Sequence, residues 1–239
     1  MALFDICNGE GVIPQGTRVI PSGAFCDCFE LERVIIPDSV LKIEKHAFRN
    51  CPNLREIFIS QSVALIEVGA FGYCPNVESV VVDSMNQVYD SRKGCNSIII
   101  TAKNSVLFGC GKAVHGLPRS IRRIESEAYA GSNIDYFKLL LPSHIKSIGA
   151  GAFRDVLGLG VLIILPNSIK TIPAHAFSGS GVWEVQFWGD NVKRIDSTAF
   201  EGARERFCVR VPAERGEFYR ALFPESLSSR VEEESIALV

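Results

Sequence analysis

Long apolar runs, basic runs and paired cysteines are scarce in this chain, and each absence excludes a class of protein. The longest apolar stretches are short, as in Val161–Pro166, and none approaches the ~18 residues that a membrane helix needs. The 25 basic residues are balanced by 27 acidic ones, without a run of five Lys or Arg, so the charge gives no reason to expect nucleic-acid binding. None of the eight cysteines forms a CxxC pair, and the spacings of zinc sites are not matched.

The first residues also lack the features of a secretory leader. The stretch "MALFDICNGEG" has no basic region followed by an apolar one. We therefore expect a cytoplasmic protein if Met1 is the native start, and a cell-surface protein if a leader has been removed. Without a leader, reduced thiols are favoured over disulfides, although an oxidised secreted domain stays open as an alternative.

The chain does contain an internal sequence repeat. Ala47-Phe48 and Ala70-Phe71 lie 23 residues apart, and the same Cys-Pro-Asn follows each pair. Further Ala-Phe pairs begin at Ala24, Ala152, Ala176 and Ala199, and Ala128-Tyr129 is an altered copy. The successive spacings are 23, 23, 58, 24, 24 and 23 residues. A fixed period of this size predicts a solenoid, in which one unit cannot bury its own apolar side but stacked units can.

Most units share an internal order. In five of the seven, a short segment rich in apolar residues precedes a proline that lies ten residues before the alanine, and these prolines are Pro14, Pro37, Pro118, Pro142 and Pro166. The apolar segments are typical of β-strands. A proline at the strand end removes no hydrogen bond from the sheet. The pattern therefore predicts strand beside strand and Phe upon Phe along the stack.

The whole motif resembles the BspA-like leucine-rich repeat family. It reads strand–Pro–x–x–Val–x–x–Ile–x–x–x–Ala-Phe–x–x–Cys–x–x–Leu and covers about residues 12–212. The resemblance implies a curved α/β solenoid of leucine-rich repeats, with rungs of ~23 residues made mostly of short β-strands and turns. It implies no catalytic activity, since members of the family are mostly known or presumed to bind other molecules, often at bacterial surfaces.

The long gap between Ala70 and Ala128 predicts an insertion. Val88–Ile121 resembles a unit inserted in bacterial members of the family, and it contains two apolar segments around Lys103-Asn104, which predict a β-hairpin packed on the solenoid. Val209–Glu225 resembles the family's C-terminal cap, a last strand followed by a short capping helix. We interpret the acidic Val231–Ser235 as a solvated end beyond the cap, with a docking role as the alternative. The expected single domain, 1–239, divides into a cap (1–11), repeats (12–83), the inserted unit (84–117), repeats (118–212), and a second cap with the tail (213–239).

The cysteines of the repeats predict packing and not chemistry. Cys28, Cys51 and Cys74 each lie four residues after the repeat alanine, where a ladder of thiols could bind metal or form disulfides. Other repeats place Ser132, Val156, Ser180 and Ala203 in the same slot. A slot that accepts Val and Ala needs a small volume and not sulfur, so we expect no metal there.

No catalytic constellation emerges elsewhere. His46 and His175 precede the Ala-Phe pair, where other copies carry Gly, Glu or Thr, and this variety suggests a solvent-facing turn. A Ser–His–Asp arrangement is not indicated. Two S-x-x-K strings occur, but the S-D-N and K-T-G motifs that accompany this string in serine β-lactamases are missing. We therefore expect a non-enzymatic protein without a cofactor.

The strand face is the candidate binding surface. If Val34 and Ile36 point inward, then Arg33 and Ile35 point outward. Carried along the repeats, this register gives two outward columns. One contains Arg33, Glu56, Ser79, Lys138, Leu162, Glu184 and Cys208, and the other contains Ile35, Phe58, Val81, Leu140, Ile164, Gln186 and Arg210. We interpret the apolar stripe on the concave sheet face, together with Arg33, Glu56 and Glu184, as a partner site. The alternatives are that β-propensity alone explains the stripe, or that the insert covers it.

Two binding functions and one enzymatic function follow as hypotheses. The first is a scaffold that binds a protein or peptide of unknown identity on the concave sheet face, without nucleic-acid binding or membrane insertion. The second is a bacterial cell-surface, adhesin-like module for a host protein or glycan, with Trp183 or Trp188 as the platform for a sugar. The third, an enzyme of unrecognised type, would require a deep polar pocket with convergent ionisable groups.

Overall fold

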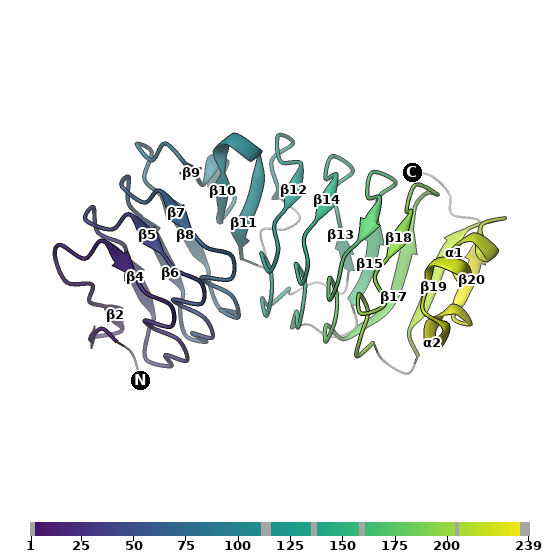
Figure 1. Cartoon of the computed structure of the whole chain (residues 1–239), viewed down its shortest axis with the longest axis horizontal. Helices are drawn as coiled ribbons and strands as arrows, with labels where there is room; N and C mark the ends of the chain where they lie inside the picture. Colours follow the sequence, from purple (N-terminus) through teal and green to yellow (C-terminus); the bar gives the residue numbers. More distant parts are fainter. Residues whose placement is uncertain (1–2, 111–115, 135–137, 158–160, 204–205, 235–239) are drawn as a thin grey trace.

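The computed structural model describes residues 3–110, 116–134, 138–157, 161–203 and 206–234 (Figure 1). The chain forms a β-solenoid of about nine coils of ~23 residues, stacked side by side along the long axis of the molecule (Figure 1). Its few helices gather at the C-terminal end. The period read from the Ala-Phe pairs is therefore the period of the coils.

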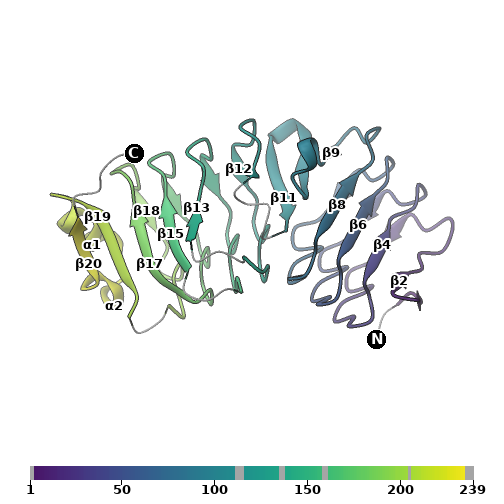
Figure 2. The same cartoon turned by 180° about the vertical axis from the view of Figure 1, so that it is seen from behind.

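One strand of each coil lies on a common side of the stack and forms two mainly parallel sheets (Figure 2). The first sheet contains β1 (Ile6–Cys7), β2 (Glu10–Gly11), β4 (Arg33–Ile35), β6 (Glu56–Ile59) and β8 (Ser79–Val82), with only the β1–β2 pair antiparallel. The second sheet contains β13 (Lys138–Leu140), β15 (Val161–Leu165), β17 (Val182–Phe187), β19 (Cys208–Pro212) and β20 (Val231–Glu234). We call the outward side of β4, β6, β8, β13, β15, β17 and β19 the sheet face.

A second row of short strands follows the proline turn of each coil. It comprises β3 (Val19–Ile20), β5 (Lys42–Ile43), β7 (Leu65–Ile66), β12 (Arg123–Ile124), β14 (Ser147–Ile148), β16 (Thr171–Ile172) and β18 (Arg194–Ile195). Each ends on the repeat isoleucine, which is buried, and each starts on a more exposed residue. Each of these two-residue strands thus shows the alternation of a more exposed and a buried side chain that is expected of a half-buried strand.

The repeat aromatics form a ladder of stacked rings inside the solenoid. Phe48 and Phe71 are parallel within 4°, with ring centroids 4.9 Å apart, and Phe25 stacks on Phe48 at 5.1 Å. In the C-terminal half the ladder runs from Tyr129 through Phe153, Phe177 and Phe200, at centroid distances of 5.3–5.5 Å. All these rings are buried, so the predicted Phe stack is confirmed.

The inserted unit is a hairpin that joins the stack. It contains β9 (Tyr89–Asp90), the 3-10 turns η1 (Arg92–Gly94) and η2 (Thr101–Lys103), β10 (Ser97–Ile100) and β11 (Ser105–Gly109). β10 and β11 are antiparallel around Asn104, which adopts the left-handed conformation, as the hairpin prediction requires. β11 also pairs in parallel with β12, so the hairpin takes a place in the row of coils.

This hairpin is buried on both of its sides. Ile98 and Phe108 belong to the core of the N-terminal half, whereas Ile99 and Val106 belong to the core of the C-terminal half. The Phe108 ring lies 5.6 Å from Phe71 and continues the aromatic ladder. Burial on both sides explains why its sequence is a continuous apolar run without alternation.

In six of the seven copies, the residue before the Ala-Phe or Ala-Tyr pair has a specific backbone requirement that the sequence analysis missed; Thr198 is the exception. His46, Glu127 and His175 have φ of 63°, 57° and 53°, and Gly69 occupies the same position with φ of 74°. This left-handed conformation costs little for glycine and more for other residues. The position is therefore chosen for its backbone geometry, and His46 and His175 are half-buried.

The C-terminal cap confirms one prediction and corrects another. The last repeat strand, β19, is followed by α1 (Gly216–Leu222) and α2 (Glu225–Ser228), as expected of a cap. The interpretation of Val231–Ser235 as a solvated end holds for the exposed side chains of Glu232, Glu233 and Glu234 but not for their backbone. Val231–Glu234 form β20, which pairs in parallel with β19, and Val231 is buried. Ser235 lies outside the described residues.

Candidate partner-binding face

The register of the first sheet brings the predicted outward residues together. Ile35 pairs with Phe58, and Phe58 pairs with Val81, on the adjacent strands β4, β6 and β8. Neighbouring strands lie ~4.8 Å apart, so the three side chains form a strip ~10 Å long. We call Ile35, Phe58 and Val81 the apolar strip.

The apolar strip is open to solvent. Ile35 and Val81 are each 46% exposed, and Phe58 between them is half-buried. The described part of the insert takes its own place in the stack and leaves these residues uncovered, so the alternative that the insert hides them does not hold there. Exposed apolar side chains that lie next to one another can contribute binding energy when a partner excludes water.

Charged side chains border the apolar strip on the same strands. Arg33 lies two residues before Ile35 on β4, on the same side of the strand. It forms an ion pair with Glu10, with an Nη2–Oε2 distance of 2.6 Å. Its neighbour Glu56 is exposed. A cavity of about 170 Å³ opens beside them, lined by Asn8, Gly9, Glu32, Arg33, Arg55 and Glu56. An apolar centre with a charged rim is the usual composition of a protein interface.

The C-terminal half of the sheet face differs from the prediction. Leu140 is 38% exposed, but Ile164 and Glu184 are only 1% and 5% exposed, although the register places both on the outward columns. Ile164 lies between Leu140 and Gln186 on strands ~4.8 Å apart, and the Gln186 amide is held by Glu184 at 2.6 Å. The expected exposure of Ile164 and of Glu184 was therefore wrong.

Glu184 belongs to an ion-pair network instead. Its Oε1 lies 3.0 Å from Nε of Arg210, which also approaches Glu232 at 3.9 Å and Glu234 at 3.5 Å on β20. A carboxylate as buried as that of Glu184 requires such a partner, because an unpaired buried charge is strongly destabilising. The network therefore ties β17, β19 and β20 together.

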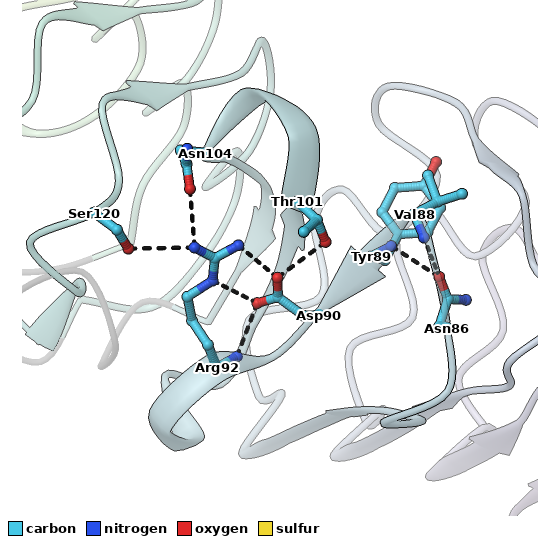
Figure 3. Close-up of polar contacts among 8 residues, drawn as sticks. All are labelled: Asn86, Val88, Tyr89, Asp90, Arg92, Thr101, Asn104 and Ser120. Carbon is cyan, nitrogen blue, oxygen red and sulfur yellow. Dashed lines mark hydrogen bonds and ion pairs between the residues drawn. The ribbon is translucent and has the colours of Figure 1, made fainter.

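The insert carries the densest polar network of hydrogen bonds on this part of the chain. Figure 3 shows the Arg92 guanidinium between the Asp90 carboxylate and the side chains of Asn104 and Ser120. Thr101 donates a further hydrogen bond to Asp90 at 3.0 Å. Burial alone would raise the pKa of Asp90, but the hydrogen bonds from Arg92 and Thr101 outweigh it and lower that pKa. The network fastens the hairpin to the coil that follows it.

A second polar anchor joins the insert to the preceding coil. The buried Asn86 amide donates to the carbonyls of Ser60 and Val63. It accepts hydrogen bonds from the backbone N–H groups of Val88 and Tyr89 (Figure 3). The Tyr89 hydroxyl accepts the backbone N–H of Ile66 at 2.8 Å, beside the edge strand β7. Sequence reasoning missed both anchors, because neither Asn86 nor Tyr89 belongs to the repeat.

The cysteine slot is structural, with one addition to the prediction. Cys51 donates its thiol hydrogen to the carbonyl of Phe25 at 3.0 Å, one coil back, and Cys74 does the same to Phe48 at 3.1 Å. Ser180 reproduces this bond to Phe153 at 2.9 Å. Within the described ranges, His, Cys, Asp and Glu form no group of three that could hold a metal ion. The slot therefore selects a small side chain, often one that can donate a hydrogen bond.

Comparison with known proteins agrees with the geometry. A family model described as "BspA type Leucine rich repeat region (6 copies)" matches residues 3–107 and 95–206. Among curated proteins, none matches the chain. In the parts of the chain that the structure describes, no helix is long and apolar enough to cross a membrane.

One solved structure shares the fold at low sequence identity, and a second has a lower structural similarity. A leucine-rich cell surface protein from Faecalibacterium prausnitzii A2-165 is 22% identical, with a TM-score of 0.72 over 95% of this chain and 62% of that protein. A leucine-rich repeat protein from Eubacterium ventriosum is 15% identical, with a TM-score of 0.49 over 97% of this chain and 84% of the other. The chain thus spans about three fifths of the F. prausnitzii protein.

Proposed function

The chain belongs to the BspA-type leucine-rich repeat family, and from this premise we propose that it is a non-enzymatic scaffold that binds a protein or peptide on its sheet face. Repeat scaffolds of this kind use stacked strands as an extended binding surface. The observation that carries the proposal is the apolar strip, three in-register side chains that the rest of the described chain leaves open.

Phe58 is the proposed anchor of the interaction. It is the largest member of the apolar strip, it lies at the centre, and aromatic side chains of this kind often supply most of the energy of an interface. The partner would place an apolar side chain against Phe58. Arg33 and Glu56 would contribute orientation more than affinity, since both lie on the exposed rim. Leu140 would add a contact only to a partner that reaches the second sheet, and Ile164 and Glu184 would add none while buried.

The test is affinity capture with the purified chain and its Phe58→Asp variant, followed by mass spectrometry of the captured proteins. Leu65→Asp is the matched control, because Leu65 is also 46% exposed but lies on β7, in the other row of strands. We expect Phe58→Asp to fold, as judged by circular dichroism, and to lose proteins that the wild type and Leu65→Asp both retain. Capture of the same proteins by all three chains would mean that the strip reflects β-propensity alone.

We also infer a location at the cell surface. The inference is supported by the description of the F. prausnitzii protein as a cell surface protein, and it is compatible with an adhesin-like role for the same scaffold. Treatment of intact source cells with a protease that cannot enter them tests this inference. Loss of the chain under conditions that spare a cytoplasmic marker supports a surface location, and its survival contradicts it.

A further inference from the structure

We propose a second binding site, separate from the sheet face, that takes one uncharged sugar ring of a glycan. It is a cavity of about 250 Å³ just beyond the carboxyl ends of β15, β17 and β19. Its lining consists of Asn167, Trp188, Gly189, Asp190, Pro212, Ala213 and Arg215. The proposal does not rest on the protein-binding function of the apolar strip.

The repeat departs from its own pattern at this place. In the sheet register, Leu165 pairs with Phe187 and Gln186 with Arg210, which places Trp188 opposite the strand-end prolines Pro166 and Pro212. The turn after Trp188 is also one residue longer, since Val192 follows Trp188 by four residues whereas Ile169 follows Pro166 by three. The coil that begins at Pro166 stacks without either change, so stacking on a neighbouring coil does not require them.

The chemistry of the lining fits a neutral polyhydroxy ring. The half-buried Trp188 provides a flat apolar wall, suited to the C–H face of a sugar. Asp190 and Arg215 form an ion pair, with an Oδ2–Nη2 distance of 2.6 Å. Almost half of each side chain stays exposed. The carboxylate can accept and the guanidinium can donate hydrogen bonds to ligand hydroxyls.

The same ion pair argues against a charged ligand. Asp190 would repel an anion such as a phosphate, and Arg215 would repel a cation. Because the two charges cancel, the cavity has no net charge to compensate. An uncharged ligand with both donors and acceptors is therefore favoured over an ionic one.

The walls are fixed before any ligand arrives. The Tyr219 hydroxyl, on a fully buried side chain, donates to the Gly189 carbonyl at 2.5 Å. Asn167 packs against Gly189 so closely that a Cβ on this glycine would lie 2.0 Å from its Oδ1. Asn191 donates its backbone N–H to the same Asn167 oxygen at 3.2 Å. A prearranged site loses little entropy on binding.

The size of the cavity limits the ligand and its affinity. About 250 Å³ lies below the ~300–1,000 Å³ of pockets for drug-sized ligands, which indicates room for a single ring. Favourable contacts of one ring correspond to a dissociation constant on the order of 1 mM. Tighter binding would require a multivalent glycan or several copies of the chain.

The chain allows a direct spectroscopic test, because it contains only two tryptophans. Trp183→Phe leaves Trp188 as the single indole and removes a residue near the opposite end of β17. We would titrate this variant with the methyl glycosides of glucose, galactose, mannose and N-acetylglucosamine and record tryptophan fluorescence. Saturation-transfer NMR on the wild-type chain gives an independent readout.

We expect at least one glycoside to give a saturable fluorescence change and saturation transfer to its ring protons. Asp190→Ala, on an exposed turn, should weaken that binding about tenfold or more. Trp188→Ala should abolish the saturation transfer while circular dichroism stays native. The proposal is overturned if none of the four glycosides binds up to about 50 mM, or if both variants bind as the wild type does.

Discussion

Replacing Phe71 with Ala tests the aromatic ladder that holds successive coils together. Phe71 is 1% exposed, and its ring stacks on Phe48 with a centroid distance of 4.9 Å. On its other side it meets Phe108 of the insert at 5.6 Å and a 45° tilt. The substitution therefore removes contacts both within the N-terminal coils and between those coils and the insert.

The expected loss follows from these contacts. A buried Phe→Ala substitution costs about 3–5 kcal/mol through lost burial and the cavity left behind. Aromatic pairs in favourable geometry contribute about 0.5–1.5 kcal/mol beyond area alone, and Phe71 has two such partners. We therefore expect a loss of about 4–5 kcal/mol in the free energy of unfolding, measured by urea titration with far-ultraviolet circular dichroism.

Phe29→Ala is the matched control for this measurement. Phe29 is 62% exposed, so its removal should change the free energy of unfolding by no more than about 0.5 kcal/mol. A loss below about 1 kcal/mol for Phe71→Ala would refute the stacked-coil reasoning. Equal losses for Phe71→Ala and Phe29→Ala would do the same.

Two further predictions concern the cysteine slot and the insert. Cys51→Ser should lower the free energy of unfolding by less than about 1 kcal/mol, because Ser180 makes the same hydrogen bond in the same slot. Cys51→Ala should lose that bond, which contributes about 0.5–1.5 kcal/mol. Urea titration checks both variants, and a smaller loss for Ala than for Ser would contradict the role of the bond. The lowered pKa of Asp90 means that its contribution to stability is complete above the unfolded-state pKa of ~3.9 and is lost as the pH falls through the lower folded-state value. Asp90→Asn should therefore lower the melting temperature at neutral pH and reduce its further fall between about pH 5 and pH 2, and an unchanged acid slope would speak against the Asp90–Arg92 pair.

The repeated elements of the fold were accessible from the sequence because one pattern determines many residues. The Ala-Phe pairs predicted the stacked rings, and the strand alternation predicted that Ile35, Phe58 and Val81 would pair across three strands. A one-residue error of register would have reversed every side chain, so the exposure of Ile35 and Val81 supports the register on these strands. The hairpin around Asn104 followed from its turn residues in the same way.

The non-repeated elements were not accessible, because their roles depend on contacts between distant residues. The burial of Glu184 depends on its ion pair with Arg210, which lies 26 residues further along the chain on β19. Asn86 follows no periodic pattern, although its amide bonds to two carbonyls more than 20 residues away. Trp188 at the end of its strand was visible in the sequence, but only the folded structure shows that Asp190 and Arg215 line the same cavity.

The two-sided burial of the inserted hairpin has a consequence for how the chain folds. The coils on either side form separate hydrophobic cores, and each core is made mostly from residues within one half of the sequence. Such local units can collapse independently and quickly, because little loop entropy opposes their contacts. Because β10 and β11 contribute side chains to both cores, complete burial of the hairpin requires both halves to be folded. The hairpin would couple the unfolding of the two halves. If the halves unfold in separate steps, a substitution that stabilises the hairpin should merge these steps into one cooperative transition.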